Sequence, residues 1–223
     1  QFGAVNTIFS NLRNSTGIQG VNGPPGTGKT TLLLDVIAEV IVERAKVISG
    51  LGCDNIFKRG GYRKVEKESG YPLHTYLLDA KFQNNFGIVI ASNNNAAVEN
   101  ISKELPAKSK IDTTVFENAD YFSKCSTQLI QEASWGVLAA ALGNAKNRNN
   151  FRKAFWVSNQ EKQTLGFEDL LYSIYKDENN NTTHQYRESF EAENKKFKSL
   201  VNQFEGFKKI ANQFHELLPE FVE

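Results

Sequence analysis

The sequence lacks methionine altogether and has few cysteines and histidines. Its two cysteines, Cys53 and Cys125, stand alone without a Cys-x-x-Cys spacing, and its three histidines are scattered. These residues give no metal-binding signature, and a reducing, cytoplasmic location is expected. Because a natural open reading frame begins with methionine, we expect the 223-residue chain to be a segment of a longer polypeptide.

Long hydrophobic runs and a large excess of charge of one sign are also missing. No stretch of about 18 apolar residues occurs, so no membrane span is expected, and no signal peptide is visible. The formal net charge is +1, so the charge of the whole molecule neither favours nor excludes nucleic acid, and any basic surface must be local. A hydrophobic content of 40% with 23% charged residues is typical of a globular protein with one large domain or two small ones.

The sequence does contain a glycine-rich loop, residues 23–30, that reads Gly-Pro-Pro-Gly-Thr-Gly-Lys-Thr. This loop fits the phosphate-binding pattern G-x-x-x-x-G-K-[ST]. Glycine lets the backbone adopt turns that are closed to other residues, so that successive N–H groups can point at a phosphate. Lys29 is expected to reach the β- and γ-phosphates, and the Thr30 hydroxyl is expected to hold Mg²⁺. The candidate nucleotide-binding residues of this stretch are Gly23, Pro24, Pro25, Gly26, Thr27, Gly28, Lys29, Thr30 and Thr31.

The segments on both sides of the loop have the character that a phosphate loop requires. Residues 18–23 are partly apolar, as in a buried strand, and residues 30–44 have helical spacing without a breaker. A strand, loop and helix in this order aim the positive end of the helix dipole at the anion. The alternative is a Gly/Pro-rich turn that matches the pattern by chance, and it is disfavoured because all the fixed positions and both flanks are present.

Further along, the sequence predicts two more strands and a helix. Residues 86–91 form a compact apolar run typical of a buried parallel strand, and residues 96–105 have helical spacing that stops at Pro106. Between them stand Ser92 and three asparagines, at a place where open α/β sheets bind ligands, although a helix cap explains them equally well. Residues 113–116 predict a third strand.

Residues 46–85 read as an excursion from this core with one or two short helices, such as residues 73–82. Glycines punctuate the segment, which also holds a small basic run. The run favours a solvated loop over a contact with nucleic-acid phosphates. Its members, with one tyrosine among them, are Lys58, Arg59, Tyr62, Arg63, Lys64 and Lys67.

The second half of the chain is predicted to be helical. Residues 121–142 are apolar on one side, and residues 146–156 interleave four cations with three aromatic rings. That interleaving suits single-stranded nucleic acid, but a helix with buried rings and solvated charges is slightly favoured. The last forty residues carry a heptad that predicts a long helix packed against another helix, as an intramolecular hairpin rather than a parallel dimer. The apolar positions of its two seams are Phe190, Phe197, Phe204, Ala211 and Leu218, and Leu200, Phe207, Phe214 and Phe221.

The loop resembles motif I of superfamily 1 helicases, in the branch that contains the nonsense-mediated-decay enzyme. Gln1 followed by Ala4-Val5 resembles the Q motif of that branch, and residues 91–101 resemble motif Ia, in which an Asn-x-Ala-Val element leads a helix. The chain is also similar to large bacterial DEAD/DEAH-like helicases with a helical region between motifs Ia and II. The residues that carry this last similarity are Trp135-Gly136, Leu142-Gly143-Asn144, Asn147-Arg148 and Phe151.

The resemblance implies an α/β P-loop NTPase (RecA-like) fold with a partial parallel sheet and a large α-helical insertion that ends in the heptad helix. The core would span residues 1–116 and the insertion residues 117–223. ATP and Mg²⁺ would be the cofactors, Lys29 and Thr30 the catalytic residues of this segment, and Gln1 the adenine contact. Asn94 and Asn95 would face single-stranded nucleic acid. The full-length protein would couple ATP hydrolysis to movement on nucleic acid, with the remainder of the polypeptide as the partner of this segment.

The chain departs from the family at motif II, an Asp-Glu pair that follows an apolar strand. The nearest candidate, Leu77-Leu78-Asp79-Ala80, lacks the glutamate and precedes motif Ia. Phosphoryl transfer needs the metal ligand, the water-positioning group and the charge clamp together, so we expect nucleotide binding without hydrolysis from this segment alone. Two alternatives remain, an AAA+-type or other P-loop ATPase that remodels proteins, and a helical interaction module carried on a degenerate P-loop fold.

Overall fold

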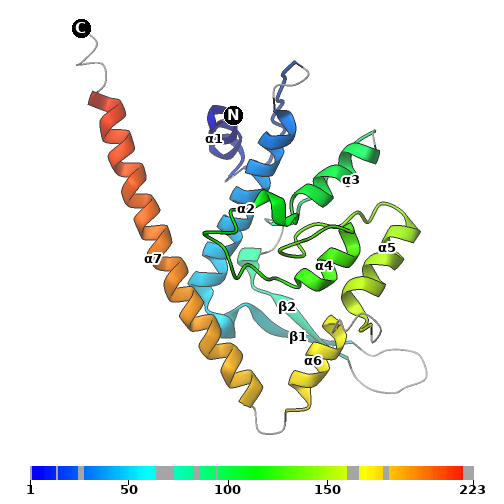
Figure 1. Ribbon diagram of the computed structural model, residues 1–223. Helices are drawn as coiled ribbons and strands as arrows, with labels where there is room; N and C mark the ends of the chain where they lie inside the picture. Colours follow the sequence, from blue (N-terminus) through cyan, green and yellow to red (C-terminus); the bar gives the residue numbers. More distant parts are fainter. Residues whose placement is uncertain are drawn as a thin grey trace. The chain divides into compact units, whose positions relative to one another are not determined.

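The computed structural model describes residues 2–13, 15–24, 28–63, 73–82, 86–93, 95–159, 166–177 and 181–217 (Figure 1). Helices dominate this part of the chain, and the one sheet within it has two strands. The α-helices are α1 (Phe2–Leu12), α2 (Lys29–Leu51), α3 (Asn95–Glu104), α4 (Ser123–Ile130), α5 (Ala145–Phe151), α6 (Phe167–Tyr175) and α7 (Asn181–Leu217). The strands are β1 (Phe57–Arg63) and β2 (Leu73–Leu78), and the short helical turns are η1 (Cys53–Asn55), η2 (Ala80–Phe82), η3 (Lys108–Lys110) and the π-helical η4 (Arg152–Trp156).

The chain divides into two compact units. One consists of Gln1–Glu39 and Ile88–Glu178, and the other of Val40–Gly87 and Asn179–Glu223. Helix α2 crosses from the first unit to the second. The sequence predicts a nucleotide-binding core that ends at residue 116 and a helical insertion after it. The division into compact units does not test that boundary, which stays a prediction.

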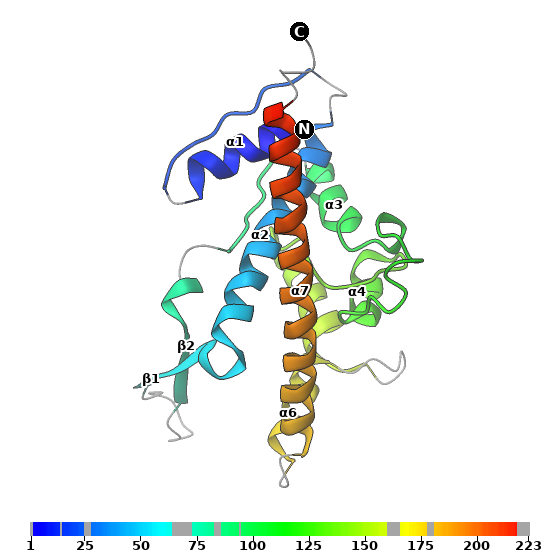
Figure 2. The same ribbon diagram turned by 90° about the vertical axis from the view of Figure 1, so that its left-hand side faces the viewer.

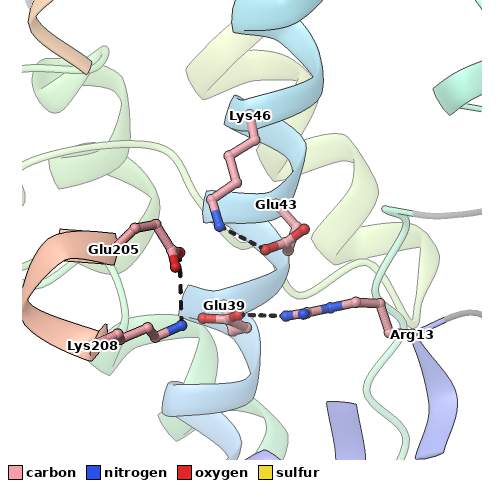
Figure 3. Close-up of polar contacts among 6 residues, drawn as sticks. All are labelled: Arg13, Glu39, Glu43, Lys46, Glu205 and Lys208. Atoms are coloured by element: carbon pink, nitrogen blue, oxygen red, sulfur yellow. Dashed lines mark hydrogen bonds and ion pairs between the residues drawn. The ribbon is translucent and has the colours of Figure 1, made fainter. Parts of the chain in front are cut away.

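Helix α1 opens the described part of the chain, and an ion pair joins the residue after its end to α2. Arg13 Nη2 lies 2.9 Å from Glu39 Oε1 (Figure 3). The Arg13 guanidinium also lies over the Phe9 ring. Figure 3 also shows two pairs within single helices, Lys46 with Glu43 and Lys208 with Glu205. Because the partners are partly exposed, each pair contributes at most about 1 kcal/mol, and their main effect is orientation.

Helix α2 begins where the loop motif predicts but runs seven residues past the predicted end at Arg44. Residues 45–51 contain no proline, and Ser49 is buried on this last part of the helix. The helix ends before Gly52, whose φ of 71° is the left-handed conformation that commonly terminates helices. Gly50 therefore does not stop the helix, and Gly52 follows its end.

The strands predicted at residues 18–23 and 86–91 are not formed. Residues 16–24 and 87–92 have no regular secondary structure, and the Ile18 and Val89 side chains are 100% and 94% exposed. A parallel strand is stable when strands bond to it and helices cover it. No strand in the described part of the chain pairs with either segment, so their apolar side chains have no sheet in which to be buried.

The predicted helix at residues 73–82 is also wrong, because its first six residues form strand β2. Strands β1 and β2 are antiparallel, with Phe57 opposite Leu78 and Arg59 opposite Tyr76. A bulge follows Arg59, and a Cβ on Gly60 would lie 2.8 Å from Thr75 Oγ1. Pairing with a neighbouring strand thus overrides the helical spacing of this segment.

Asp79 anchors the end of this hairpin. Its side chain is buried, its Oδ2 lies 2.7 Å from Lys58 Nζ, and its Oδ1 accepts the Lys81 N–H at 3.0 Å. The hydrogen bond from Lys58, followed by that from the Lys81 backbone, lowers the pKa of Asp79 below its ordinary value of 3.8. The folded state therefore favours the carboxylate more than the unfolded state does.

Acid should weaken this anchor in a defined pH range. Because the pKa of Asp79 is lower in the folded state, its contribution to stability is present above pH 3.8 and is lost as the pH falls through the lowered pKa. We expect Asp79→Asn to be less stable than wild type at pH 7, and the difference to shrink between pH 4 and pH 2. Urea unfolding of both proteins across this pH range measures the difference in their free energies of unfolding. A difference that is constant with pH would contradict the assignment.

In the first unit, a buried serine cluster holds the loop after α4 against the end of α3. Ser134 Oγ lies 2.8 Å from the Pro106 carbonyl oxygen and 2.6 Å from Ser126 Oγ, and it accepts the Gly136 N–H at 3.1 Å. The Trp135 indole donates to the Leu105 carbonyl at 3.2 Å. The end of α3, helix α4 and the loop that follows α4 are thereby joined at Ser134.

Ser134→Ala should destabilise the chain by about 1–2 kcal/mol, because it leaves buried polar partners unsatisfied. Ser173→Ala is the matched control, since the Ser173 hydroxyl is exposed and bonds only to Leu170 in its own helix. The control should change the free energy of unfolding by less than about 0.5 kcal/mol. Equal effects of the two substitutions in urea unfolding would contradict the role of the cluster.

Two further predictions in this unit need correction. The helix predicted for residues 121–142 stops at Ile130, where Gln131 is left-handed with φ 59°, and the following segment bonds to residues 106–108 instead. The strand predicted at residues 113–116 is a turn, because Asp112 Oδ1 accepts both the N–H and the hydroxyl of Thr114. Side-chain bonds to the nearby backbone compete here with regular structure.

The rings of the predicted cation–aromatic segment pack against one another. Phe155 stacks on Phe151 and on Phe167, with ring centroids 5.3 Å apart in both pairs. Phe122 meets Phe155 and Phe167 edge to face, and its ring contacts stabilise a left-handed backbone with φ 57°. The favoured alternative, a helix with buried rings, is therefore confirmed only in part, because Phe151 and Phe155 are half-buried and Trp156 is 40% exposed. The cations Lys146, Arg148, Arg152 and Lys153 are all exposed.

Helix α7 confirms the long helix predicted from the heptad. Helix α7 runs beside the part of α2 that belongs to the same unit (Figures 1 and 2). The Asn194 side chain is buried and pairs with Ser49 of α2 by a short hydrogen bond, and Arg187 bonds to Asp54. The seam beyond Asn194 is not buried as predicted. At 1.5 Å per residue, the part of α2 in this unit is roughly 18 Å long against roughly 55 Å for α7, so it covers only part of the seam. The seam residues that are more than half exposed are Leu200, Phe204, Phe207 and Phe214.

Candidate nucleotide-binding site

The described part of the glycine-rich loop leads directly into helix α2. Gly28 has φ 78°, in the left-handed region that favours glycine, and α2 begins at the next residue, Lys29. A residue with a Cβ at this position would cost roughly 1–2 kcal/mol. The Gly28 carbonyl accepts the Leu32 N–H at 2.9 Å, which is the first bond of the helix. The predicted need for glycine is therefore confirmed at Gly28.

Lys29 turns its side chain back over the start of the loop. Its Nζ donates to the carbonyl oxygens of Gly23 at 2.5 Å and of Pro24 at 3.1 Å. Lys29 is exposed, so anions in solution reach its ammonium group. The positive charge stands at the N-terminus of a 23-residue helix, whose unbonded N–H groups also favour anions. The loop, the helix end and Lys29 together are suited to bind a phosphate.

The structure brings some of the predicted site residues together, and the roles of others stay predictions. Thr30 and Thr31 lie in the first turn of α2, next to Lys29, and Thr31 is exposed. Asn95 is the first residue of α3, so the asparagine run does lead a helix. The roles of the Thr30 and Asn95 side chains stay predictions. The remaining predicted residues lie outside the described part of the chain, and they are Gln1, Pro25, Gly26, Thr27 and Asn94.

Carboxylates do not gather near a metal position in the part of the chain that the structure describes, where no group of three or more His, Cys, Asp or Glu residues could hold an ion. Asp79 follows strand β2, but it pairs with Lys58 as a structural anchor. Asp177 begins an Asp-Glu pair in the sequence, and it follows helix α6 rather than a strand. Neither residue has the context of motif II.

Sequence reasoning did not anticipate the contacts of Lys29 with its own loop. The carbonyl groups of Gly23 and Pro24 belong to the backbone, so no residue type signals them. The signal that was available is the spacing, since Gly23 and Lys29 are six residues apart within one motif. These contacts place the Lys29 ammonium at the loop before any phosphate arrives.

A left-handed glycine, a lysine at the first helical position and a long helix behind it define the class of P-loop nucleotide-binding proteins. The comparison with protein families agrees with this class. The family model described as "AAA domain" matches residues 4–218, and the chain belongs to that family, a P-loop family of helicase-like ATPases of superfamily 1 type.

No curated protein and no solved structure matches the chain significantly. Among the helices that the structure describes, none combines the length and the apolar character needed to cross a bilayer.

Proposed function

We propose that the chain is the ATP-binding segment of a superfamily 1 helicase-like ATPase that couples ATP hydrolysis to translocation on nucleic acid or to its unwinding. The observation that carries this proposal is the geometry of Gly28 and Lys29 at the start of α2, in a chain whose family match extends from residue 4 to residue 218. Within the chain, residues 1–116 would form the nucleotide-binding core and residues 117–223 the helical insertion.

Lys29 would exchange its partners when a nucleotide binds. Its Nζ now bonds to two neutral carbonyl oxygens, and phosphate oxygens would replace them as anionic acceptors. Hydrogen bonds between an ammonium and an anionic oxygen are about twice as strong as those between neutral groups. The backbone N–H groups from Gly26 to Thr31 would share the phosphate, since Pro24 and Pro25 have none to donate, and Gln1 would contact the adenine.

The Thr30 hydroxyl would hold Mg²⁺, for which a hard oxygen ligand in the first turn of α2 is suited, and phosphate oxygens and water would complete the octahedron. The ion would neutralise charge between the phosphates. Hydrolysis also needs a carboxylate to order the attacking water and a cation to stabilise the transition state, and we assign these groups to the remainder of the polypeptide. We therefore expect this chain to bind ATP with negligible turnover.

The preference among adenine nucleotides tests the proposal. Lys29 and the loop contact the β- and γ-phosphates, so ATP and ADP should displace a fluorescent ATP analogue from the chain with affinities within about tenfold of each other. AMP, which lacks both phosphates, should compete at least about 100-fold more weakly, since each charge-assisted bond is worth roughly 1.5–3 kcal/mol. AMP that competes as well as ATP would overturn the assignment of the site.

Nucleic acid is the proposed second ligand, with Asn94 and Asn95 facing a single strand. A labelled single-stranded oligonucleotide should bind more tightly than the same sequence as a blunt duplex. The logarithm of its binding constant should fall linearly with the logarithm of the salt concentration, as lysines and arginines displace counterions. A duplex that binds as tightly as the single strand at every salt concentration would contradict this part of the proposal.

A further inference from the structure

Helices α3, α4 and α5 enclose a pocket that the proposed nucleotide site does not use. Its volume is about 180 Å³, and all of its lining belongs to the first unit. These helices lie next to one another on the right of Figure 1. The volume is below the roughly 300–1,000 Å³ of pockets that hold drug-sized ligands, so the pocket suits one planar ring system.

The pocket lining combines apolar and polar residues. Its apolar members are Leu129 and Ile130 of α4, the alanines 139–141 and Phe151. Asn147 and Asn150 of α5 lie three residues apart on one face of that helix and are part of the polar lining. Helix α3 contributes Glu99, Ser102 and Lys103.

The two asparagine side chains are available to a ligand. Within the described part of the chain, the side-chain amides of Asn147 and Asn150 form no hydrogen bond, since only the backbone N–H of Asn147 is engaged, by Asn144. An amide offers two donors and an acceptor at fixed angles, which matches the edge of a nucleobase. The helix that carries the amides is held in place, because Asn144 caps it and Arg148 bonds to the Leu142 carbonyl.

Within the lining Glu99 offsets the charge of Lys103, so the positive charge that favours an anionic polymer comes from the neighbouring residues 143–158. Residues 143–158 contain Lys146, Arg148, Arg152 and Lys153 and no acidic residue, in a chain whose net charge is only +1. All four cations are exposed and follow or precede the pocket asparagines by a few residues. They are placed to bind the phosphates on either side of a base.

We infer that this pocket binds one unstacked base of a single-stranded nucleic acid, with the Asn147 and Asn150 amides on its edge, Phe151 among the apolar atoms beneath it, and the cations of α5 and η4 on the flanking phosphates. This inference rests on the proposed function, since its ligand is the single-stranded nucleic acid that is proposed to face Asn94 and Asn95. Single-stranded nucleic acid offers bases that can leave the stack and be recognised on their edges.

Strands with and without bases test the inference. The probes are labelled 12-nucleotide single strands of thymidine and abasic strands of the same length, with binding to the 223-residue chain followed by fluorescence anisotropy. Asn147→Ala/Asn150→Ala and, separately, Asn150→Leu should weaken binding of the thymidine strand by about tenfold and leave binding of the abasic strand unchanged. Asn149→Ala is the matched control on the same helix, because Asn149 does not line the pocket, and it should match wild type with both strands.

Each other outcome has a distinct meaning. If the pocket variants bind both strands as wild type does, or if Asn149→Ala has the same effect, the pocket inference is wrong and the proposed function stands. If wild type binds neither strand, the pocket inference and the nucleic-acid part of the proposed function both fail, while competition by ATP and ADP still tests the nucleotide site. Asn150→Leu keeps the comparison valid if the double variant does not fold, since Asn150 is exposed and leucine favours helix.

Discussion

Lys29→Ala should lower the affinity of the chain for Mg–ATP by at least about 100-fold. The substitution removes the ammonium group that bonds to the Gly23 and Pro24 carbonyls and that would bond to the β- and γ-phosphates. Two charge-assisted hydrogen bonds at roughly 1.5–3 kcal/mol each account for a loss of this size. Displacement of a fluorescent ATP analogue measures the change.

Folding should be nearly unaffected by this substitution, since Lys29 is exposed and water replaces its contacts with the two carbonyls. Lys46→Ala is the matched control, because Lys46 lies on the same helix and pairs with Glu43 instead of the loop. The control should bind ATP like wild type. Equal losses in the two variants would show that helix charge in general, and not the position of Lys29, attracts the nucleotide.

Gly166→Ala should cause the largest loss of stability of the substitutions considered, about 3 kcal/mol or more. A Cβ on Gly166 would lie 2.5 Å from each of three backbone atoms, the Trp156 oxygen, the Val157 carbon and the Ser158 nitrogen. Backbone atoms cannot rotate away as a side chain can, so the segment after η4 and the start of α6 must separate. Overpacking of this kind costs 1–3 kcal/mol and sometimes more.

Fluorescence gives this prediction a local readout, because the chain has only two tryptophans and one of them, Trp156, is at the contact. Gly166→Ala should shift the emission and lower the midpoint of urea unfolding. Gly143→Ala is the control, since nothing lies within 4 Å of a Cβ added there. A Gly166→Ala protein as stable as the control would mean that the two segments do not approach each other so closely.

Local signals in the sequence located the elements that depend on local physics. The loop motif placed the start of α2 and the left-handed glycine at residue 28, and Pro106 correctly marked the end of α3. Helix α7 followed from its heptad. In each case a short stretch of sequence sets the backbone through its own spacing, its breakers or its glycines.

Predictions failed where a distant segment decides the structure. Residues 73–78 have helical spacing but pair with β1, and the predicted helix after Tyr121 ends early because residues 133–135 bond to residues 106–108. The prediction that the α7 seam is buried failed for a related reason. The heptad shows which face of the helix is apolar but not how much of that face a partner helix covers. The pocket between α3, α4 and α5 was not visible in the sequence, because three separate segments form it.

The sequence could predict the part of the site whose residues are close together along the chain. Lys29, Thr30 and Thr31 do stand together at the start of α2, as the motif requires. The strands expected on either side of the site are not formed, because each depends on neighbours that the local sequence does not specify. A phosphate loop is encoded within eight residues, whereas the sheet that usually supports it is encoded across the chain.

Calorimetric titration of the 223-residue chain with Mg–ATP tests the central claim most directly. The account predicts saturable binding of one nucleotide per chain, because the chain has one glycine-rich loop followed by Lys29 and α2. Burial of phosphates against the loop and Lys29 should give a favourable binding enthalpy. A titration without saturable heat at millimolar nucleotide, with the chain shown to be folded by circular dichroism, would contradict the account.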